Sequence, residues 1–481
     1  MADDEQATQL SEQIPLLSRS DEERTPSPLP LSQLAILSYP KLYEPGVIAS
    51  AFVFWKLASL VDGDGSNMTH YMNIMNWARN VSSLVAVMYW GRMSDYIGRK
   101  PILLLGMAAM TMSMLFIGLS TTFWMLIASQ CIYAGFNSNT AVINSPIGEM
   151  TDKTNRVDAF ALLRIPWFIG IGIAYLILSL SPHLLWQYFP YLFLPCTITA
   201  LLMFLGFLVI STCFHEVGST NTPSQTIAAK KYPQTHTCEH TISSIESAPT
   251  NVQHSPLPLR ALLTRPVILS VANYAFLFFT HMTFKTLHGR FLITPIPTGG
   301  LSLTPLQLIY ILTLSELCTG LVYTLALGPS IRRFGLRAVA RSTVLVFIPI
   351  FLLFPLMHIY AKGWQHQDEH TSSRNIMYIL LVVQLALFAI ADLGYGCMYM
   401  YITSSVPNKH SLGSVNGLAE TAGLVAGLIG SMIVNVMFNT WAERGWIGGY
   451  SGYYLLCLSV LGGVVLIRTL PKNSWAADES D

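Results

Sequence analysis

Long apolar runs separated by short polar breaks dominate the chain. A helix needs about 20 apolar residues to cross the hydrocarbon core of a bilayer, and runs of that length recur along most of the sequence. We place twelve of them, at about 33–59, 71–90, 101–119, 123–147, 157–180, 188–213, 264–290, 304–327, 338–360, 375–402, 411–437 and 447–469. The pattern predicts an all-α membrane protein with 12 transmembrane helices and both termini on one side of the membrane.

The second half of the chain repeats part of the first. A shift of 237 residues lays Asp95 on Arg332 and Gly98 on Gly335, in polar segments that follow the second run of each half. Internal repeats of this kind are typical of membrane proteins built from two bundles. We therefore expect two pseudo-symmetric six-helix bundles, at 31–214 and 260–470, with a disordered tail at 1–30, a polar linker at 215–259 and a second tail at 471–481.

Composition excludes several classes of protein. Charged residues make up 11% of the chain and apolar residues 52%, whereas soluble domains carry roughly 25% charged residues. A net charge of +1 provides no field for binding nucleic acid. The seven cysteines have no C-x-x-C spacing, and the sequence contains no nucleotide-binding or hydrolase motif, so we expect no cofactor, no resident metal and no enzymatic activity.

Lysine and arginine are concentrated in the tails and in the even-numbered loops between the runs. The opposite loops hold only Lys362, Arg374 and Arg444. Because basic residues are retained on the cytosolic side of membranes, this distribution predicts that both termini are cytosolic. The glycosylation sequon that begins at Asn67 then lies in the first loop on the non-cytosolic side, as N-glycosylation requires.

The N-terminal tail contains a candidate sorting signal. Glu12, Leu16 and Leu17 fit the acidic dileucine pattern E-x-x-x-L-L, which sorting adaptors bind in extended cytosolic tails. Short matches of this kind also arise by chance, so the alternative is a tail that carries no signal. A functional signal would favour a vacuolar or lysosomal membrane over the plasma membrane.

A polar stretch of eleven residues joins the second and third runs. Within it, Gly91 and Gly98 allow close approach between backbones. Asp95 and Arg99 are four residues apart and can pair on one helical face. Arg99 and Lys100 would hold the stretch on the cytosolic face. We predict a tight hairpin between two membrane helices.

This stretch, G-x-x-x-D-x-x-G-R-K followed by proline, resembles the loop 2–3 signature of the major facilitator superfamily. Further segments resemble its twelve-span drug:proton antiporter branch and, within it, the fungal zinc-induced-facilitator-like group: Glu44-Pro45, Gly148 to Arg156, Pro407 to Lys409, Gly413, and Asn416 to Ala419. The resemblance extends from about Leu31 to Leu470. It implies a secondary active transporter that moves a small organic solute by alternating access, coupled to protons, in efflux or vacuolar loading.

The resemblance also implies roles for particular segments. Spans 1, 4, 7 and 10 would line a central cavity, and the hairpin would act as a conformational latch. Asp95 would meet the N-terminus of span 11 near Ser411, where the positive end of the helix dipole favours an anion, while Arg99 pairs nearby. The latch comprises Gly91, Asp95, Gly98, Arg99 and Lys100.

Ionisable side chains inside the runs are costly in a bilayer and therefore informative. Pairing lowers their desolvation cost, so one interpretation is a set of structural ion pairs between helices, favoured for Arg79, Arg164, Glu316 and Glu420. The other is binding of substrate or protons in a shared cavity. The basic residues are Lys41, Arg79, Arg164 and Lys285, and the acidic ones are Glu44, Glu316, Asp392 and Glu420.

Polar residues recur at helical spacing in the runs that the resemblance assigns to the cavity. In span 4, three amide side chains are seven residues apart and share nearly one helical face. In span 7, His281, Lys285 and His288 share a face as well. We expect the substrate cavity to contain Lys41, Gln130, Asn137, Asn144, Lys285 and Tyr399. The alternative is hydrogen bonding between helices.

Proton coupling requires a buried carboxylate that can bind and release a proton. Glu44, beside the helix-breaking Pro45, is the first candidate and Asp392 the second; His281 could shuttle protons near neutral pH. The cationic face of span 7 suits an anionic or zwitterionic solute, whereas the two carboxylates suit an organic cation. The sequence leaves both substrate classes open.

Span 5 departs from the antiporter pattern. The expected G-P-x-x-G-G is replaced by Ala174 to Ser179, although Gly170 and Gly172 one turn earlier could allow similarly close packing. The loss leaves antiport, symport and uniport open and raises the alternative of a non-transporting membrane sensor or scaffold on the same fold. In either case we expect a monomer.

Overall fold

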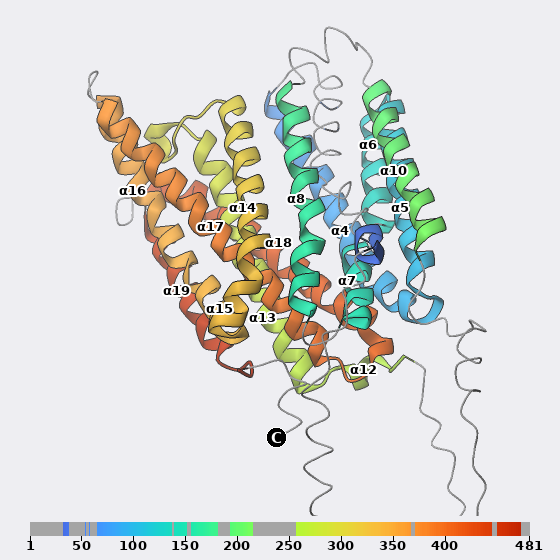
Figure 1. Cartoon of the computed structure of the whole chain (residues 1–481). Helices are drawn as coiled ribbons and strands as arrows, with labels where there is room; N and C mark the ends of the chain where they lie inside the picture. Colours follow the sequence, from blue (N-terminus) through green and yellow to red (C-terminus); the bar gives the residue numbers. More distant parts are fainter. Residues whose placement is uncertain are drawn as a thin grey trace, which may run out of the picture.

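A computed structural model describes residues 32–37, 53, 57, 65–136, 139–151, 155–180, 193–214, 256–366, 371–444 and 450–472. All regular structure within these ranges is helical (Figure 1). The helices are α4 (Gly65–Ile97), α5 (Arg99–Leu119), α6 (Phe123–Phe136), α7 (Asn139–Met150), α8 (Arg156–Leu180), α10 (Phe193–Cys213), α12 (Leu259–Leu262), α13 (Arg265–Ile293), η2 (Ile296–Thr298), α14 (Pro305–Phe334), α15 (Leu336–Leu345), α16 (Phe347–His366), α17 (Thr371–Ser405), η3 (Lys409–Ser411), α18 (Leu412–Arg444) and α19 (Ser451–Ile467).

The helices follow the predicted spans from the second onward. Span 4 corresponds to α6 and α7, between which residues 137–138 lie outside the described residues, and span 9 is divided into α15 and α16. Seven helices in the described ranges are long and apolar enough to cross a membrane. Most of span 1, the N-terminal tail, and the linker as far as residue 255 lie outside the described residues. The predicted all-α membrane fold is confirmed.

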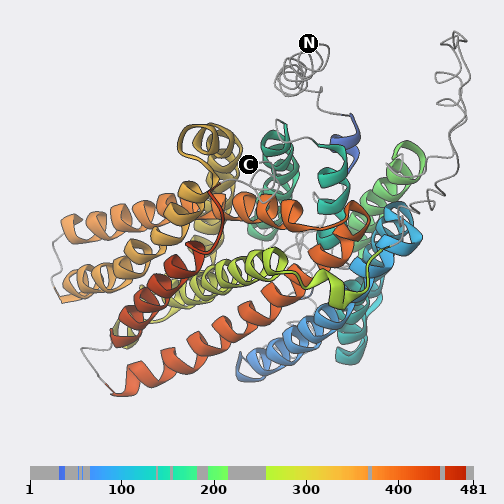
Figure 2. The same cartoon turned by 90° about the horizontal axis from the view of Figure 1, so that it is seen from below.

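The chain forms two helical bundles that meet mainly along two helix pairs. In the first bundle α5 packs against α6 and α10; in the second, α13 packs against α18 and α17, and α16 against α17 and α19. Between the bundles, α4 lies along α18 and α8 lies along α14 (Figures 1 and 2). Because α4 and α14 are the second helices of their halves, the two contacts are related by the internal repeat.

The predicted hairpin is shorter than expected. Helix α4 continues through the polar stretch to Ile97, and the single residue Gly98 separates it from α5. Gly98 has φ 108° and ψ 165°, a backbone conformation open essentially to glycine alone. Gly335, its repeat partner, has φ 82° and ψ 153° between α14 and α15. We call the end of the molecule that carries both glycines the hairpin end, which lies at the bottom of Figure 1.

Substituting the hairpin glycine tests this backbone requirement. We expect Gly98→Ala to lower the free energy of unfolding by about 1–3 kcal/mol, because alanine is strained in this conformation. Thermal melting of the purified protein measures the change. Gly135→Ala in α6 is the control, since an added Cβ there would have no neighbour within 4 Å; an equal loss in both variants would contradict the backbone explanation.

The other end of α4 also differs from the prediction. The helix begins at Gly65, so Asn67 lies in its first turn and not in a loop. The apolar run predicted a later start for this helix because residues 65–70, GSNMTH, are mainly polar. The residue remains at the end of α4 opposite the hairpin end, and its glycosylation stays a prediction.

Small residues allow both pairs of helices between the bundles to approach closely. A Cβ added to Gly91 on α4 would lie 2.7 Å from the carbonyl oxygen of Gly413 and 3.0 Å from the Cα of Gly417, both on α18. A Cβ added to Gly172 on α8 would lie 2.6 Å from Leu317 on α14. Gly172 therefore permits close packing of span 5 although the family pattern there is absent.

Candidate functional site

A largely buried group of charged side chains lies where α8 of the first bundle meets α13, α14 and α17 of the second. We call Arg164, His281, Lys285, Glu316 and Asp392 the charge cluster. Arg164 Nη2 on α8 is 3.8 Å from Asp392 Oδ2 on α17, and His281 Nε2 on α13 is 3.2 Å from Asp392 Oδ1. Asp392 is 2% exposed and His281 4%. One carboxylate therefore faces a cation from the first bundle and an imidazole from the second.

Aromatic rings surround the guanidinium of Arg164. Its Cζ lies 4.6 Å from the ring centroid of Trp167, 5.2 Å from that of Tyr395 and 5.7 Å from that of Tyr323. The negative faces of such rings attract a cation, more strongly where water is excluded. The rings help to offset the cost of burying Arg164, while the 3.8 Å separation from Asp392 is longer than a hydrogen bond.

The second pair of the charge cluster lies within the second bundle. Lys285 on α13 donates a hydrogen bond to Glu316 on α14 at 3.1 Å, and its ammonium lies 5.8 Å from the ring centroid of Trp167 on α8. Glu316 is buried, whereas about a third of the Lys285 side chain is exposed. Trp167 thus lies near both cations of the cluster.

Tyr399 links three helices beside the charge cluster. Its hydroxyl donates to Glu420 on α18 at 3.3 Å, and its ring stacks on Phe160 of α8 with centroids 6.0 Å apart. The ring of Tyr274 on α13 lies 5.7 Å away. Tyr399 and Glu420 are both buried, so this tyrosine extends the polar network from α17 to α18.

A pocket of about 570 Å³ opens between α4, α6, α13 and α18. We call it the amide pocket, because three asparagines contribute to its wall. Asn76, Asn80 and Ser83 follow at i, i+4 and i+7 along α4 and share one helical face. The described lining is Asn76, Trp77, Arg79, Asn80, Ser83, Tyr133, Phe278, Met282, Thr286, Leu424, Gly427, Leu428, Ser431, Met432 and Asn435.

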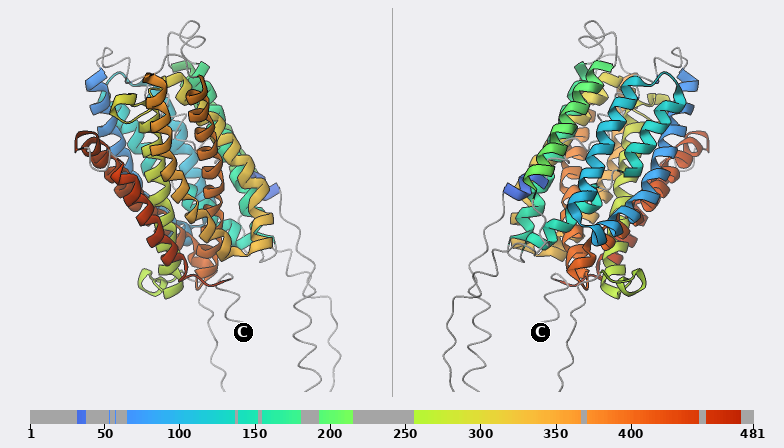
Figure 3. Two further views of the ribbon diagram at one scale, coloured as in Figure 1. Left: turned by 90° about the vertical axis from the view of Figure 1, so that its left-hand side faces the viewer. Right: turned by 90° about the vertical axis from the view of Figure 1, so that its right-hand side faces the viewer.

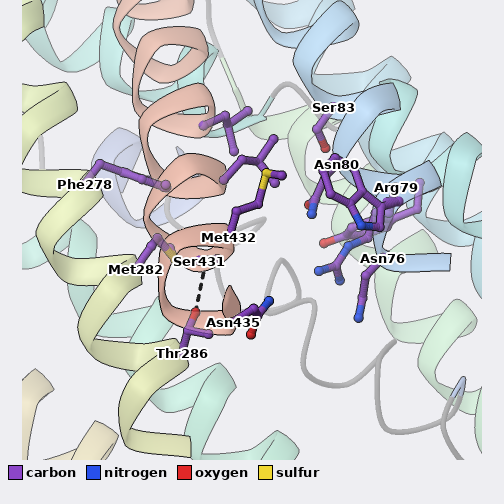
Figure 4. Close-up of a pocket in the computed structure, with 15 residues that line it drawn as sticks. Asn76, Arg79, Asn80, Ser83, Phe278, Met282, Thr286, Ser431, Met432 and Asn435 are labelled. Atoms are coloured by element: carbon purple, nitrogen blue, oxygen red, sulfur yellow. Dashed lines mark hydrogen bonds between the residues drawn. The ribbon is translucent and has the colours of Figure 1, made fainter. Parts of the chain in front are cut away.

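The amide pocket combines hydrogen-bonding groups with one cation. Figure 4 shows Asn76, Arg79 and Asn80 on one side and the hydrogen bond between Thr286 and Ser431, with oxygens 3.0 Å apart, on the other. Arg79 is the one charged residue in the described lining, which contains no carboxylate. Aromatic and methionine side chains complete the wall. Such a pocket suits a partly apolar solute that carries negative charge.

The latch residues join the two bundles at the hairpin end. Asp95 Oδ1 accepts from the backbone N–H of Gly413 at 2.9 Å, and Oδ2 accepts from the N–H and the hydroxyl of Ser414, both at 2.6 Å. These groups belong to the first turn of α18, where the helix dipole favours an anion. The contact lies near Ser411, as expected, and Ser411 itself accepts a hydrogen bond from the N–H of Leu257.

Arg99 extends the latch to a third helix. Its guanidinium pairs with Asp95 and donates to Glu149 on α7 at 2.9 Å. Burial raises the pKa of Glu149, and the charge of Arg99 only partly opposes this effect. Lys100 follows on α5 and is partly exposed. Asp95 and Arg99 of the latch, together with Glu149 and the N-terminus of α18, therefore form a largely buried polar network.

The repeated hairpin makes a different contact. Arg332 on α14, which the repeat lays on Asp95, pairs with both carboxylate oxygens of Asp158 on α8 at 3.2 Å. Their side chains are 58% and 39% exposed. The two halves therefore join at two related positions, one buried and one exposed to water.

Several predicted site residues lie elsewhere. Lys41, Glu44, Asn137, Glu12, Leu16 and Leu17 are outside the described residues. Gln130 and Asn144 are buried in α6 and α7, but they are not in the described lining of the amide pocket. His288 lies not with the charge cluster but beside Phe284 and Phe354, with ring centroids 5.1 Å and 6.3 Å away. Tyr399, Lys285, His281 and Asp392 come together around α13 and α17.

Sequence reasoning missed most of the amide pocket. The i, i+4, i+7 spacing of Asn76, Asn80 and Ser83 was an available signal, as was the i, i+4 pair Ser431 and Asn435 on α18. Both lie outside the spans that the family resemblance assigns to the cavity.

Comparisons with known proteins identify the family. Residues 68–431 match the family model described as Major Facilitator Superfamily. The chain is 21% identical over 529 residues to the major facilitator superfamily multidrug transporter mfsB of Aspergillus fumigatus, covering 95% of this chain and 85% of the relative. It is 25% identical over 407 residues to protein ZINC INDUCED FACILITATOR 1 of Arabidopsis thaliana, covering 79% and 78%.

The fold also matches a solved structure. The crystal structure of the human organic anion transporter MFSD10 (TETRAN) aligns with a TM-score of 0.64, covering 92% of this chain and 100% of that one at 15% identity. The likeness concerns the arrangement of helices.

Proposed function

Since this chain belongs to the major facilitator superfamily, and is therefore a multi-pass membrane transporter of small molecules, we propose that it couples the movement of an organic anion to protons through the charge cluster. Asp392 faces Arg164 of one bundle and His281 of the other. That shared carboxylate is the observation on which the proposal depends.

The coupling follows from the cost of a buried charge. When the bundles move relative to each other, Arg164 separates from Asp392, which leaves an ionised carboxylate in apolar surroundings at a cost of several kcal/mol. Protonation of Asp392 removes that charge. Proton binding therefore favours the arrangement in which the two residues are apart, and proton release favours the arrangement in which they pair.

The substrate class follows from the charges that the structure places in the charge cluster and in the amide pocket. Asp392 and Glu316 each lie beside cations, so neither is the natural partner of an organic cation. The amide pocket offers Arg79 and amide donors in a partly apolar wall. We infer a monovalent organic anion or a zwitterion with an apolar portion. The likeness in fold to MFSD10, a human organic anion transporter, supports this class.

The orientation follows from the distribution of basic residues. The hairpin end carries Arg99, Lys100, Arg260, Arg332 and Arg337 at helix ends, and we propose that it faces the cytosol. Transport would then be efflux from the cytosol or loading of a compartment such as the vacuole, which the N-terminal dileucine pattern favours.

Flux in proteoliposomes tests the proposed function. We expect an imposed pH gradient to drive movement of organic anions by the wild-type protein, while organic cations of similar size move much more slowly. Collapse of the gradient with a proton ionophore is expected to abolish the gradient-driven component. Absence of flux across the whole panel, together with ligand-dependent binding of a partner protein, would instead support the sensor on the same fold.

Neutralising the cation of the amide pocket tests the substrate class. We expect Arg79→Gln to raise the KM for an organic anion about tenfold, because a hydrogen bond to a charged group is lost, and to leave flux of a neutral analogue nearly unchanged. Arg290→Gln removes an exposed cation one turn beyond Thr286 on α13 and serves as control. Equal effects of Arg79→Gln on anion and neutral analogue would contradict the assignment.

A further inference from the structure

A second pocket lies at the hairpin end of the second bundle, away from the charge cluster and the amide pocket. It has a volume of about 630 Å³ and lies between the turn from α14 to α15 and the C-terminal end of α19. Figures 1 and 3 show these helix ends together at the lower edge of the second bundle. We call it the basic pocket. Four cations line it: Arg337, Arg341, Arg468 and Lys472.

A hydrogen bond joins the two helix ends that form the basic pocket. The guanidinium of Arg337 donates to the carbonyl oxygen of Arg468 and so ties the start of α15 to the end of α19. No described residue forms an ion pair with Arg341, Arg468 or Lys472, and the described lining contains no carboxylate. By contrast, Arg332 nearby is paired with Asp158. Concentrated positive charge of this kind favours a multiply charged anion.

The N-terminus of α15 adds to this preference. The helix runs for ten residues, and no side chain caps its N-terminus. Gly335, which lines the pocket, precedes it with a positive φ. The free backbone N–H groups of a first helical turn, together with the helix dipole, form a ready site for phosphate, and arginine binds phosphate with paired hydrogen bonds.

The surface leading to the pocket is apolar. On α19, Leu458, Leu461 and Val465 are 63%, 49% and 63% exposed. Leu461 is seven residues before the pocket cation Arg468, which caps the C-terminal end of α19, so the apolar face of the helix continues to the edge of the basic pocket. An amphiphile can therefore place acyl chains along α19 and a charged group among the arginines. A soluble anion would contact only the arginines.

We infer that the basic pocket binds a phosphate group of high negative charge, and that the group belongs to an anionic membrane lipid of the phosphoinositide type. The four cations supply the charge, the N-terminus of α15 supplies backbone donors, and the exposed stripe of α19 accommodates the acyl chains. Basic pockets between membrane helices are known to hold such headgroups. This site is separate from the proposed substrate pathway, and its occupancy does not depend on which solute is transported.

Binding to the purified full-length protein in detergent tests the inference. The probes are short-chain phosphatidylinositol bisphosphate, phosphatidylcholine of equal chain length, and inositol trisphosphate without acyl chains. We expect the bisphosphate lipid to bind about tenfold or more tightly than either of the other two, because it alone combines the phosphates with acyl chains. Higher salt is expected to weaken its binding.

A double variant assigns the binding to the pocket. We expect Arg341→Gln/Lys472→Gln to weaken binding of the bisphosphate lipid about tenfold or more, with an unchanged melting temperature in the absence of lipid. The matched control is Arg260→Gln/Arg265→Gln, which removes two exposed cations from the same end of the molecule. The assignment of the site would be overturned if the double variant bound the bisphosphate lipid as tightly as the wild type. It would also be overturned if the control variant lost as much affinity for this lipid as the double variant. Equally tight binding of inositol trisphosphate would overturn the lipid as the source of the phosphate.

Discussion

Asp95→Asn is expected to reduce transport at least about tenfold while leaving the amount of folded protein in the membrane unchanged. The carboxylate accepts three hydrogen bonds from α18 and pairs with Arg99, and its side chain is fully buried. Asparagine has the same shape but no charge, and its amide would place a donor against a donor of Ser414. Removing one partner of a buried pair costs about 3–5 kcal/mol.

The substitution destabilises only the conformation in which the hairpin end is closed. The contact between α4 and α18 exists while the hairpin end is closed, so its loss shifts the equilibrium toward the state in which this end is open, by about a hundredfold or more for 3 kcal/mol. The measurement is solute flux in vesicles, with cysteine cross-linking between α4 and α18 to report closure. Wild-type flux in Asp95→Asn, with unchanged cross-linking, would discard the latch.

Asp158→Asn is the matched control for the latch. It breaks the pair with Arg332 at the related position between α8 and α14, where both side chains are largely exposed. Exposed pairs contribute about 0–1 kcal/mol, so we expect flux within about twofold of wild type. If Asp158→Asn lost as much flux as Asp95→Asn, loss of either contact between the bundles would be enough to reduce transport. Burial would then not distinguish the two contacts.

Asp392→Asn is expected to abolish proton-driven transport and also to destabilise the protein. The variant leaves Arg164 buried without its carboxylate, and an uncompensated buried charge costs about 3–5 kcal/mol. Arg164→Gln is expected to destabilise by a similar amount for the opposite reason. Thermal melting measures the stability, and flux with and without a pH gradient measures the coupling.

The double variant Arg164→Gln/Asp392→Asn separates the two effects. Removal of both charges restores a neutral cluster, so we expect the melting temperature to recover most of the loss. Coupling needs a group that binds a proton, so we expect the double variant to respond no more to the pH gradient than Asp392→Asn. Recovery of proton-driven flux in the double variant would contradict the role of Asp392 and point to another carboxylate such as Glu44.

Some partners in the site could be predicted from the sequence and others could not. The contact of Asp95 with span 11 followed from a family motif, and the structure places it within three residues of the expected position. By contrast, the equal numbers of basic and acidic residues in the predicted spans permit many pairings, and the pairing of Lys285 with Glu316 is only one of them. His288 shares a helical face with His281 in sequence, yet its ring lies against Phe354 of α16, because the position of a neighbouring helix decides what a side chain meets.

The sequence by itself determined where the helices run and which residues must be glycine. Apolar runs long enough for a bilayer allow few other structures, since every backbone polar group must be bonded within the segment. The internal repeat pairs Gly98 with Gly335, and both have positive φ angles. Only the tertiary structure decided that Arg164 faces Asp392, that Arg79 opens onto an amide pocket and that four cations meet at the end of α19. Those contacts join helices far apart in sequence, and their geometry depends on how the two bundles pack, which local pattern does not encode.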